Sequence, residues 1–191
     1  MSITITEIVT KDIRFPTSRE LDGSDSVHTD PDYSAAYVIL KTDDPNGCSG
    51  HGLTFTLGRG NEVCVSAIQA IAPLVVGQSI NFIFSNMGEF WQSIANDSQL
   101  RWLGPEKGVI HLATGAVINA LWDLYAKIQG KPLWKVLVDM TPEEIVSCID
   151  FRYITDALTP QEALAILTKN VNTKKEREER MLCHGYPAYN T

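Results

Sequence analysis

The sequence has little of what marks a membrane protein or a nucleic-acid-binding protein. It contains no uninterrupted run of about 18 apolar residues, the length that a transmembrane helix needs. Its 16 Lys and Arg residues are outnumbered by 23 Asp and Glu residues, which gives a net charge of -7. Because phosphate binding requires a basic face, we expect neither a nucleic-acid partner nor a membrane partner.

Cysteine is scarce, and its spacing is not that of a metal site. The four cysteines are Cys48, Cys64, Cys148 and Cys183, and no C-x-x-C pair is present. Free thiols in a reducing compartment are the simplest interpretation. The first residues, MSITITEIVTKDIRF, lack the apolar core of a signal peptide and the Arg- and Ser-rich pattern of a transit peptide. We therefore expect a cytoplasmic location.

Familiar catalytic signatures are also missing. No G-x-S-x-G, H-E-x-x-H or P-loop motif is present. The stretch GRGNEV at residues 58–63 resembles the start of a dinucleotide fingerprint, but valine replaces the third glycine, and a glycine turn before a helix is the simpler interpretation. His28, Asp30 and Asp32 lie close enough in sequence for a metal site, yet Asx turns explain the aspartates equally well. His111 is interpreted as a structural residue.

What the sequence does contain is a strand-rich start. Alternating or β-branched runs predict strands at residues 3–14, 33–42 and 51–57. Sequential strands with short turns are typical of an antiparallel meander. The connection at residues 15–32 is polar, lacks periodicity and exceeds the usual loop length. In a compact domain such a loop is usually functional or disordered.

Helical spacing of apolar residues dominates the middle of the chain. Helices are predicted at residues 63–75, 80–94 and 110–128. The last of these is the strongest, and it ends at Gly130, which suits a left-handed cap, while Pro132 suits the start of the next helix. Trp122 and Trp134 are expected to pack across this break.

The final third changes character. Residues 148–153 belong to a short apolar run, VSCIDFRYI, that predicts a buried strand. Thr159 and Glu162 have the spacing of a capping box at a helix start. The charge run KKEREER at residues 174–180 indicates a solvated helix face. The residues by themselves predict an α+β domain and no complete catalytic set.

Four stretches resemble one known superfamily closely. AVINALWDLYAKIQGKPLWKVL resembles the junction of the enolase superfamily, where a helix ending in W-D-x-x-A-K-x-x-G-x-P-L closes the N-terminal cap and leads to the barrel. RFPTSRELDGSDSVHTDPDYSAAYV, QLRWLGPEKGV and IDFRYITDALT resemble the L-fuconate dehydratases of that superfamily. The resemblance runs along essentially all 191 residues.

The resemblance implies an α+β fold with two parts. Residues 1–140 are expected to form the enolase-type N-terminal cap, a three-stranded antiparallel meander plus helices. Residues 141–191 are expected to form the first strand and a helical excursion of a truncated, modified TIM barrel. The strand predicted at residues 148–153 would be the first barrel strand.

The activity implied is that of a hydro-lyase in carbohydrate catabolism. Such enzymes remove water from L-fuconate to give 2-keto-3-deoxy-L-fuconate, with Mg2+ assisting abstraction of the α-proton. The base, the acid and the metal ligands of the superfamily come from barrel strands that would lie beyond Thr191. We therefore name no catalytic residue and no metal ligand, and we expect the 191-residue chain alone to be inactive.

The cap of this superfamily contributes a mobile loop that closes over the barrel mouth and contacts the substrate. By resemblance, Gly23, Ser24 and Asp25 match the substrate-binding tip of that loop, and Tyr33 matches a substrate-binding position just after it. A glycine permits close backbone approach, and the other three side chains can hydrogen-bond sugar hydroxyls. An ordinary turn and a half-buried strand residue are the structural alternatives.

Two other functions stay open on the sequence. The substrate could be a related sugar acid, or the short chain could be a non-catalytic product that acts as an interaction module. The expected partner is a small-molecule acid sugar, L-fuconate, and the resemblance implies a homo-oligomer when the protein is full length.

Overall fold

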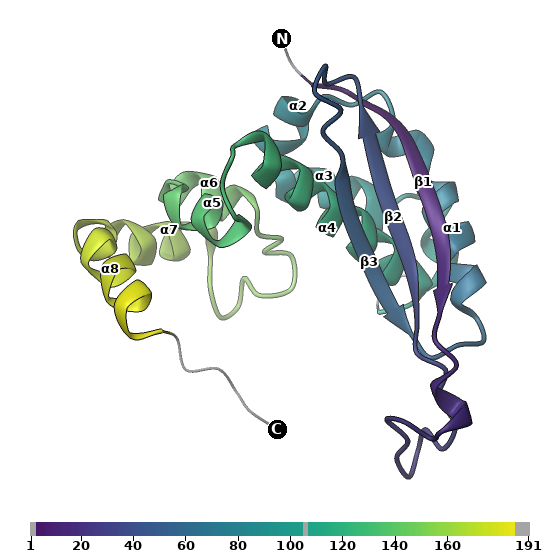
Figure 1. The fold of residues 1–191 in the computed structure, drawn as a ribbon. Helices are drawn as coiled ribbons and strands as arrows, with labels where there is room; N and C mark the ends of the chain where they lie inside the picture. The colour runs from purple at the N-terminus through teal and green to yellow at the C-terminus, as the bar shows by residue number, and fades with distance from the viewer. Residues whose placement is uncertain (1–2, 105–106, 186–191) are drawn as a thin grey trace.

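A three-stranded antiparallel sheet with helices on one face forms the body of the protein (Figure 1). The computed structural model describes residues 3–104 and 107–185. The strands are β1 (Ile5–Arg14), β2 (Ser34–Thr42) and β3 (Gly50–Thr56). The helices are α1 (Asn61–Val75), α2 (Ile80–Ser85), α3 (Met87–Ala95), α4 (Val109–Ile128), α5 (Leu133–Asp139), α6 (Pro142–Ser147), α7 (Pro160–Lys169) and α8 (Lys174–His184). The predicted α+β class and antiparallel meander are confirmed.

The sheet has the order β1-β2-β3, and Ile8 of β1 pairs with Leu40 of β2. Alternate side chains of a strand point to opposite faces, and Ala36, Val38 and Leu40 of β2 are fully buried on the inner face. Helices α1 and α4 cover this face and lie behind the sheet in Figure 1. The alternation read from the sequence therefore identifies the covered face.

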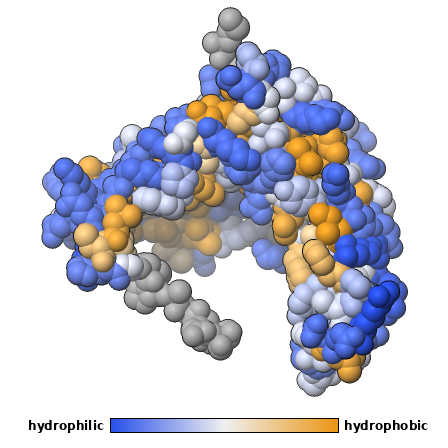
Figure 2. All heavy atoms as spheres, in the orientation of Figure 1, coloured by the Kyte–Doolittle hydropathy of each residue, from blue (hydrophilic) through white to orange (hydrophobic). Residues whose placement is uncertain are grey.

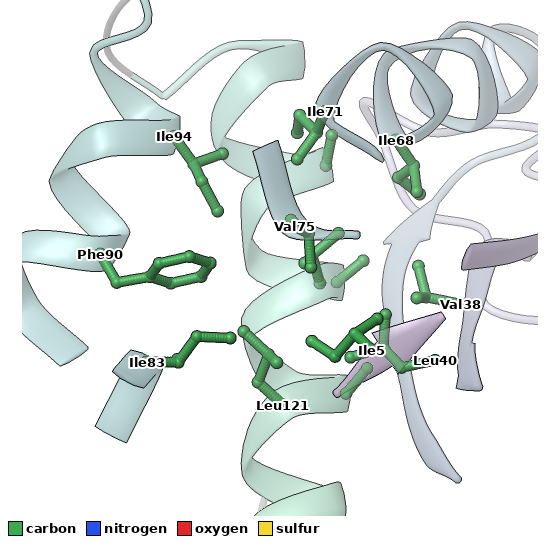
Figure 3. Packing of buried hydrophobic residues seen from close by; sticks show 14 of the residues in the cluster. Ile5, Val38, Leu40, Ile68, Ile71, Val75, Ile83, Phe90, Ile94 and Leu121 are labelled. Carbon is green, nitrogen blue, oxygen red and sulfur yellow. The ribbon is translucent and has the colours of Figure 1, made fainter. Parts of the chain in front are cut away.

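The core lies where the first four helices meet the inner face of the sheet. Figure 3 shows apolar side chains from these elements pointing toward one another: Ile5, Val38, Leu40, Ile68, Ile71, Val75, Ile83, Phe90, Ile94 and Leu121. Val63, the first residue of the helix predicted at residues 63–75, is 45% exposed, whereas Cys64 is buried. The reason is that position 64, and not 63, lies on the helix face shared by Ile68 and Ile71.

Strand β3 lies in direct backbone contact with α4. A Cβ atom on Gly52 would come within 2.2 Å of the carbonyl oxygen of Ala116, and one on Gly50 within 2.1 Å of that of Ala120. Helix α4 has the length and apolar composition of a membrane-spanning helix, yet 50% of that stretch is buried inside the protein. Burial beneath the sheet accounts for its apolar surface.

The single helix predicted at residues 80–94 is wrong, because two helices occupy this segment. Asn86 separates α2 from α3 and has a non-helical φ of -156°. Its side-chain oxygen accepts a hydrogen bond from the backbone N–H of Glu89 at 3.2 Å. An asparagine N-cap of this kind begins a new helix.

Helices α5 to α8, here called the arm (residues 133–184), extend away from the sheet (Figure 1). Gly130 has the left-handed φ of 63° predicted for the end of α4, and Pro132 is the N-cap of α5. Trp122 packs edge-on against Phe84, with ring centroids 4.8 Å apart, whereas Trp134 lines a groove within the arm. The two tryptophans thus have different neighbours, contrary to the prediction.

The buried strand predicted at residues 148–153 is also wrong. Residues 149–151 have no regular structure and residues 152–157 form turns. The segment is attached to α3 by a hydrogen bond of 2.8 Å from Gln92 Nε2 to Asp150 Oδ1. A strand needs a neighbouring strand to satisfy its backbone N–H and C=O groups. Residues 107–185 contain no strand that could pair with this segment, and turns satisfy part of its backbone instead.

Candidate functional site

The β1–β2 loop (residues 15–33) projects beyond one end of the sheet, at the bottom of Figure 1. Its two ends are joined at the base. The backbone N–H of Phe15 donates to the carbonyl of Tyr33 at 2.7 Å. The hydroxyl of Thr17 donates to the carbonyl of Pro31 at 2.8 Å and accepts from the backbone N–H of Tyr33 at 2.9 Å. A loop closed at its base in this way is an Ω-type loop.

Asp32 makes a further contact at the base of the loop. Its Oδ1 atom accepts a hydrogen bond from the backbone N–H of Ser18 at 3.1 Å, and hydrogen bonds from Ser18 lower the pKa of the Asp32 carboxyl. Gly58 packs against it, since a Cβ atom there would lie 2.9 Å from Asp32 Cβ. Gly58 and Gly60 have φ angles of 100° and 96° and form the turn into α1. This turn follows antiparallel strands, as the glycine-turn interpretation of GRGNEV predicts.

The structure brings together two of the four predicted site residues, Gly23 and Tyr33. Gly23 has a left-handed φ of 71°, and a Cβ atom on it would lie 1.8 Å from the phenol oxygen of Tyr33. The ring of Tyr33 also meets the ring of Phe55 on β3 edge-on, with centroids 5.3 Å apart. The half-buried Tyr33 is therefore held between the tip of the loop and the end of the sheet.

Ser24 and Asp25, the other two predicted site residues, lie on the exposed tip. Asp25 Oδ1 accepts hydrogen bonds from the backbone N–H groups of Val27 at 2.7 Å and of His28 at 2.6 Å. Both hydrogen bonds lower the pKa of the Asp25 carboxyl, and the bond from His28 has the larger effect. Asp25 thus stabilises the turn of the tip in the manner of an Asx turn, while Ser24 carries a hydroxyl at the surface.

The described residues do not form a metal site. Asp25 Oδ2 lies 3.3 Å from His28 Nδ1, and Asp32 is engaged by Ser18. Across residues 3–104 and 107–185, no group of three or more His, Cys, Asp or Glu side chains is arranged to hold a metal ion. The interpretation of HTDPD as a metal-binding stretch is not supported.

A polar network that runs from the buried Ser34 and Asn61 to the exposed Asp12 and Arg14 supports the base of the loop, and it was not predicted from the sequence. Ser34 Oγ lies 2.6 Å from Thr56 Oγ1, Thr56 donates to Asn61 Oδ1 at 2.7 Å, and Asn61 Nδ2 donates to Asp12 Oδ1 at 2.6 Å. Arg14 then pairs with Asp12 at 2.8 Å and lowers the pKa of the Asp12 carboxyl. The signal was available, because the alternation of β2 places a polar residue, Ser34, on the core-facing side.

His111 has a structural position, as expected. Its Nδ1 accepts a hydrogen bond from the backbone N–H of Lys107 at 2.7 Å. Its ring stacks on that of Trp91, with centroids 5.6 Å apart. These contacts join α4 to α3 and to the segment that precedes α4.

The arm contains an apolar groove of about 570 Å3, formed by α5 to α8. Orange apolar surface is visible on the arm in Figure 2.

The predicted capping box of Thr159 and Glu162 begins α7, and the charge run forms the first part of α8. Part of that run is not simply solvated, because Glu178 Oε1 pairs with Lys135 Nζ of α5 at 2.7 Å. The remaining residues of the C-terminus, 186–191, lie outside the described residues.

Known proteins resemble this chain along almost its whole length. Mitochondrial enolase superfamily member 1 of Bos taurus is 59% identical over 187 residues, which cover 98% of this chain and 42% of that protein. The L-galactonate dehydratase of Hypocrea jecorina is 53% identical over 190 residues, which cover 99% of this chain and 42% of that protein. The chain thus spans less than half the length of the curated relatives it matches.

Solved structures share the fold. The crystal structure of human mitochondrial enolase superfamily member 1 matches with a TM-score of 0.94 at 55% identity, covering 100% of this chain and 43% of that chain. A racemase from Streptomyces coelicolor A3(2) with bound magnesium matches with a TM-score of 0.58 at 27% identity, covering 72% of this chain and 36% of that chain. Relatives of this fold therefore include an enzyme that binds magnesium.

The family profile described as mandelate racemase / muconate lactonizing enzyme, N-terminal domain, matches residues 24–137. This range includes the second half of the β1–β2 loop, strands β2 and β3, and helices α1 to α4. Because the match extends over more than half of the chain, the protein belongs to this family of the enolase superfamily and carries its N-terminal cap domain.

Proposed function

We propose that the chain is the substrate-covering cap of a sugar-acid dehydratase. The observation that carries this proposal is the 53% identity to the L-galactonate dehydratase of Hypocrea jecorina. That similarity covers 99% of the chain and therefore extends through the β1–β2 loop. A cap loop of this kind excludes water and contacts the substrate when it closes.

We propose L-fuconate as the substrate, with L-galactonate as the nearest alternative. L-Fuconate is 6-deoxy-L-galactonate, so the two acids differ only at carbon 6, where one has a methyl group and the other a hydroxymethyl group. The proposed reaction removes the proton on carbon 2 and the hydroxyl on carbon 3, which leave together as water. The resulting enol tautomerises to a 2-keto-3-deoxy acid.

In this proposal the residues of the chain bind and cover the substrate and do not perform the proton transfer. Ser24 and the phenol of Tyr33 offer hydroxyl groups near the tip of the loop, and hydroxyls can donate to and accept from sugar hydroxyls. Asp25 holds the tip in shape. Gly23 leaves room for a close approach of the backbone.

Magnesium is the metal we propose for the whole enzyme, by analogy with the magnesium-bound racemase that shares the fold. The described residues of this chain do not fit such an ion, because no suitable cluster of ligands is present among them. We therefore propose that the metal ligands, the base and the acid lie in the part of the family's polypeptide that this chain does not span. We keep the proposed division into a cap at residues 1–140 and the start of a barrel from residue 141.

A chimera tests the proposal directly. In it, this chain replaces the matching 43% of human mitochondrial enolase superfamily member 1. We expect the purified chimera, with Mg2+, to form a 2-keto acid from L-fuconate, and more slowly from L-galactonate. The unfused chain should give no turnover above a no-protein control. A folded chimera that leaves both acids and a wider sugar-acid panel unchanged would refute the proposal.

A second candidate function is an interaction module without catalysis. One observation favours it: the arm exposes an apolar groove that includes Trp134, Met181 and Leu182, which are 48%, 45% and 64% exposed. Exposed apolar patches often mark interaction sites. An active chimera would argue against this candidate as the main function, and sedimentation of the unfused chain would show whether the groove leads to self-association.

A further inference from the structure

Tyr33 is fixed from two directions by residues that the family resemblance does not assign to the site. Its ring packs edge-on against Phe55, at 74° between the ring planes. Its backbone N–H donates to the hydroxyl of Thr17 at 2.9 Å. Ring and backbone are thus held by different partners, one on β3 and one at the start of the loop.

Thr17 forms hydrogen bonds with several other residues of the loop. Its hydroxyl also donates to the carbonyl of Pro31 at 2.8 Å, and its own carbonyl accepts from the backbone N–H of Asp22 at 3.1 Å. The hydroxyl therefore acts both as a donor and as an acceptor, a combination that serine can provide and valine cannot. Through these bonds one side chain joins both ends of the loop.

Phe55 is a large apolar side chain that stays 53% exposed at the end of β3. Its register partner on β2 is Ala35, which leaves space over the end of the sheet for the ring of Tyr33. Edge-to-face aromatic pairs of this kind are stabilising beyond the area they bury. The contact determines where the phenol of Tyr33 can reach.

The tip of the loop rests on that phenol. Residues 20–30 are exposed, and the chain reverses through two residues with left-handed φ, Leu21 at 57° and Gly23 at 71°. The backbone of Gly23 lies directly against the hydroxyl end of Tyr33. A displacement of Tyr33 would therefore displace Gly23 and the adjacent Ser24.

We propose that Thr17 and Phe55 are positioning residues, which set the place of Tyr33 and, through it, of the Gly23–Ser24 tip. Their importance for substrate recognition rests on the proposed function, whereas the positioning itself rests on the contacts above. Neither residue needs to touch the substrate. Both act by holding the residues that would.

Nuclear magnetic resonance on the 191-residue chain tests the positioning without any substrate. For the ring contact, the variant is Phe55→Ala and the matched control is Leu53→Ala. Leu53 lies on the same strand face and is similarly exposed, at 46%, but it pairs with Tyr37 rather than lying beside Tyr33. We expect Phe55→Ala, and not Leu53→Ala, to shift the Gly23 and Ser24 amide signals and to lower their order parameters.

For the backbone contact, the variant is Thr17→Val, with Thr17→Ser as the conservative rescue and Thr29→Val as the control within the same loop. Loss of one hydrogen bond should raise the exchange rate of the Tyr33 amide about five- to tenfold in Thr17→Val. Thr17→Ser should restore the slow exchange. Thermal unfolding, followed by circular dichroism, identifies any variant that loses the fold as a whole.

The chimera supplies the functional readout. Phe55→Ala and Thr17→Val should raise KM for the sugar acid about five- to tenfold with kcat changed by less than about twofold, because a misplaced tip weakens uniform substrate binding. Leu53→Ala and Thr17→Ser should leave both constants unchanged.

The outcomes distinguish the positioning role of Thr17 and Phe55 from the proposed function. Equal tip signals in Phe55→Ala and Leu53→Ala, together with an unchanged Tyr33 amide in Thr17→Val, would overturn the positioning role whatever the chimera does. If the unmutated chimera is inactive, the proposed function fails, and the magnetic resonance comparison still decides whether Thr17 and Phe55 position the tip.

Discussion

The phenol oxygen of Tyr33 occupies the place where a side chain on Gly23 would begin: a Cβ atom added to Gly23 would lie 1.8 Å from it and 2.5 Å from the ring carbon that bears it. This relationship joins two residues ten positions apart and connects the exposed tip of the loop to the end of the sheet. It also makes glycine necessary for two separate reasons, the left-handed backbone and the contact itself.

The substitution Gly23→Ala separates these reasons when it is compared with Gly47→Ala. Gly47 has nearly the same φ, 69°, but nothing lies within 4 Å of its added Cβ atom. We expect each change to cost about 1 kcal/mol of stability from the backbone alone. Only Gly23→Ala should move the ring signals of Tyr33 and Phe55 in an NMR spectrum. Equal ring shifts in both variants would show that the contact is unimportant.

Gly52→Ala tests the close packing of β3 on α4. The new methyl group would meet the carbonyl oxygen of Ala116 at 2.2 Å and the backbone nitrogen of Ala120 at 2.5 Å. Because backbone atoms cannot rotate away, we expect a loss of about 3 kcal/mol in the free energy of unfolding, measured with guanidinium chloride.

The matched control for this experiment is Gly115→Ala on α4 itself. Nothing lies within 4 Å of an added Cβ atom at that position. Alanine favours the helix more than glycine does, so this variant should be up to about 1 kcal/mol more stable. Similar stability of Gly52→Ala and Gly115→Ala would contradict the described contact between β3 and α4.

The turn at Asp25 should be stable to acid. Hydrogen bonds from the backbone of His28 and Val27 hold the pKa of the Asp25 carboxyl below its usual 3.8. The folded loop therefore favours the ionised form, whose contribution is fully present above pH 3.8 and is lost as the pH falls through the lower, folded pKa. We expect the acid-induced change of the Val27 amide signal to have its midpoint below pH 3.8.

A second acid of the loop, Asp22, provides the control for this titration. Asp22→Asn removes another exposed acid of the same loop and should leave the pattern unchanged. Asp25→Ala should abolish the acid-induced change of the Val27 signal. A midpoint at or above the usual carboxyl value would mean that the turn does not depend on ionised Asp25.

An ion pair links α8 to α5: Glu178 pairs with Lys135 at 2.7 Å, and the Glu178 side chain is 18% exposed. Glu178→Ala should raise hydrogen exchange of the α8 amides about two- to fivefold, because a pair near the surface contributes no more than about 1 kcal/mol. The neighbouring Glu179→Ala is the control. Its partner Lys175 lies on the same helix at 3.9 Å, and Glu179 is 66% exposed. An equal effect of both variants would remove any special role for Glu178.

A large part of the fold could be predicted from local sequence patterns. Alternation predicted the three strands, helical spacing predicted α4, and Gly130 marked its end. The Thr159 capping box was equally readable, because a cap involves residues three positions apart. Each of these features depends on neighbours in the sequence, so the sequence alone was sufficient.

The two errors concern features that the periodicity of apolar residues does not report. The run at residues 148–153 has strand-like composition but no strand beside it within residues 107–185. The break at Asn86 depends on a side chain that caps α3 rather than on apolar spacing. Neither could be decided by periodicity, because both depend on where backbone hydrogen bonds find partners.

For the candidate site, the sequence by itself determined the family, the α+β class, the long polar loop and the four residues proposed at it. Only the tertiary structure decided that Gly23 lies against Tyr33 and that Asp25 stabilises the turn at the tip. It also decided that Ser34, Asn61 and Asp12 belong to one polar network beneath the loop. Residues 12, 34 and 61 come from β1, β2 and α1. Their meeting is a consequence of sheet register and helix packing, which arise from burial of the whole core and are not encoded in any short stretch of the chain.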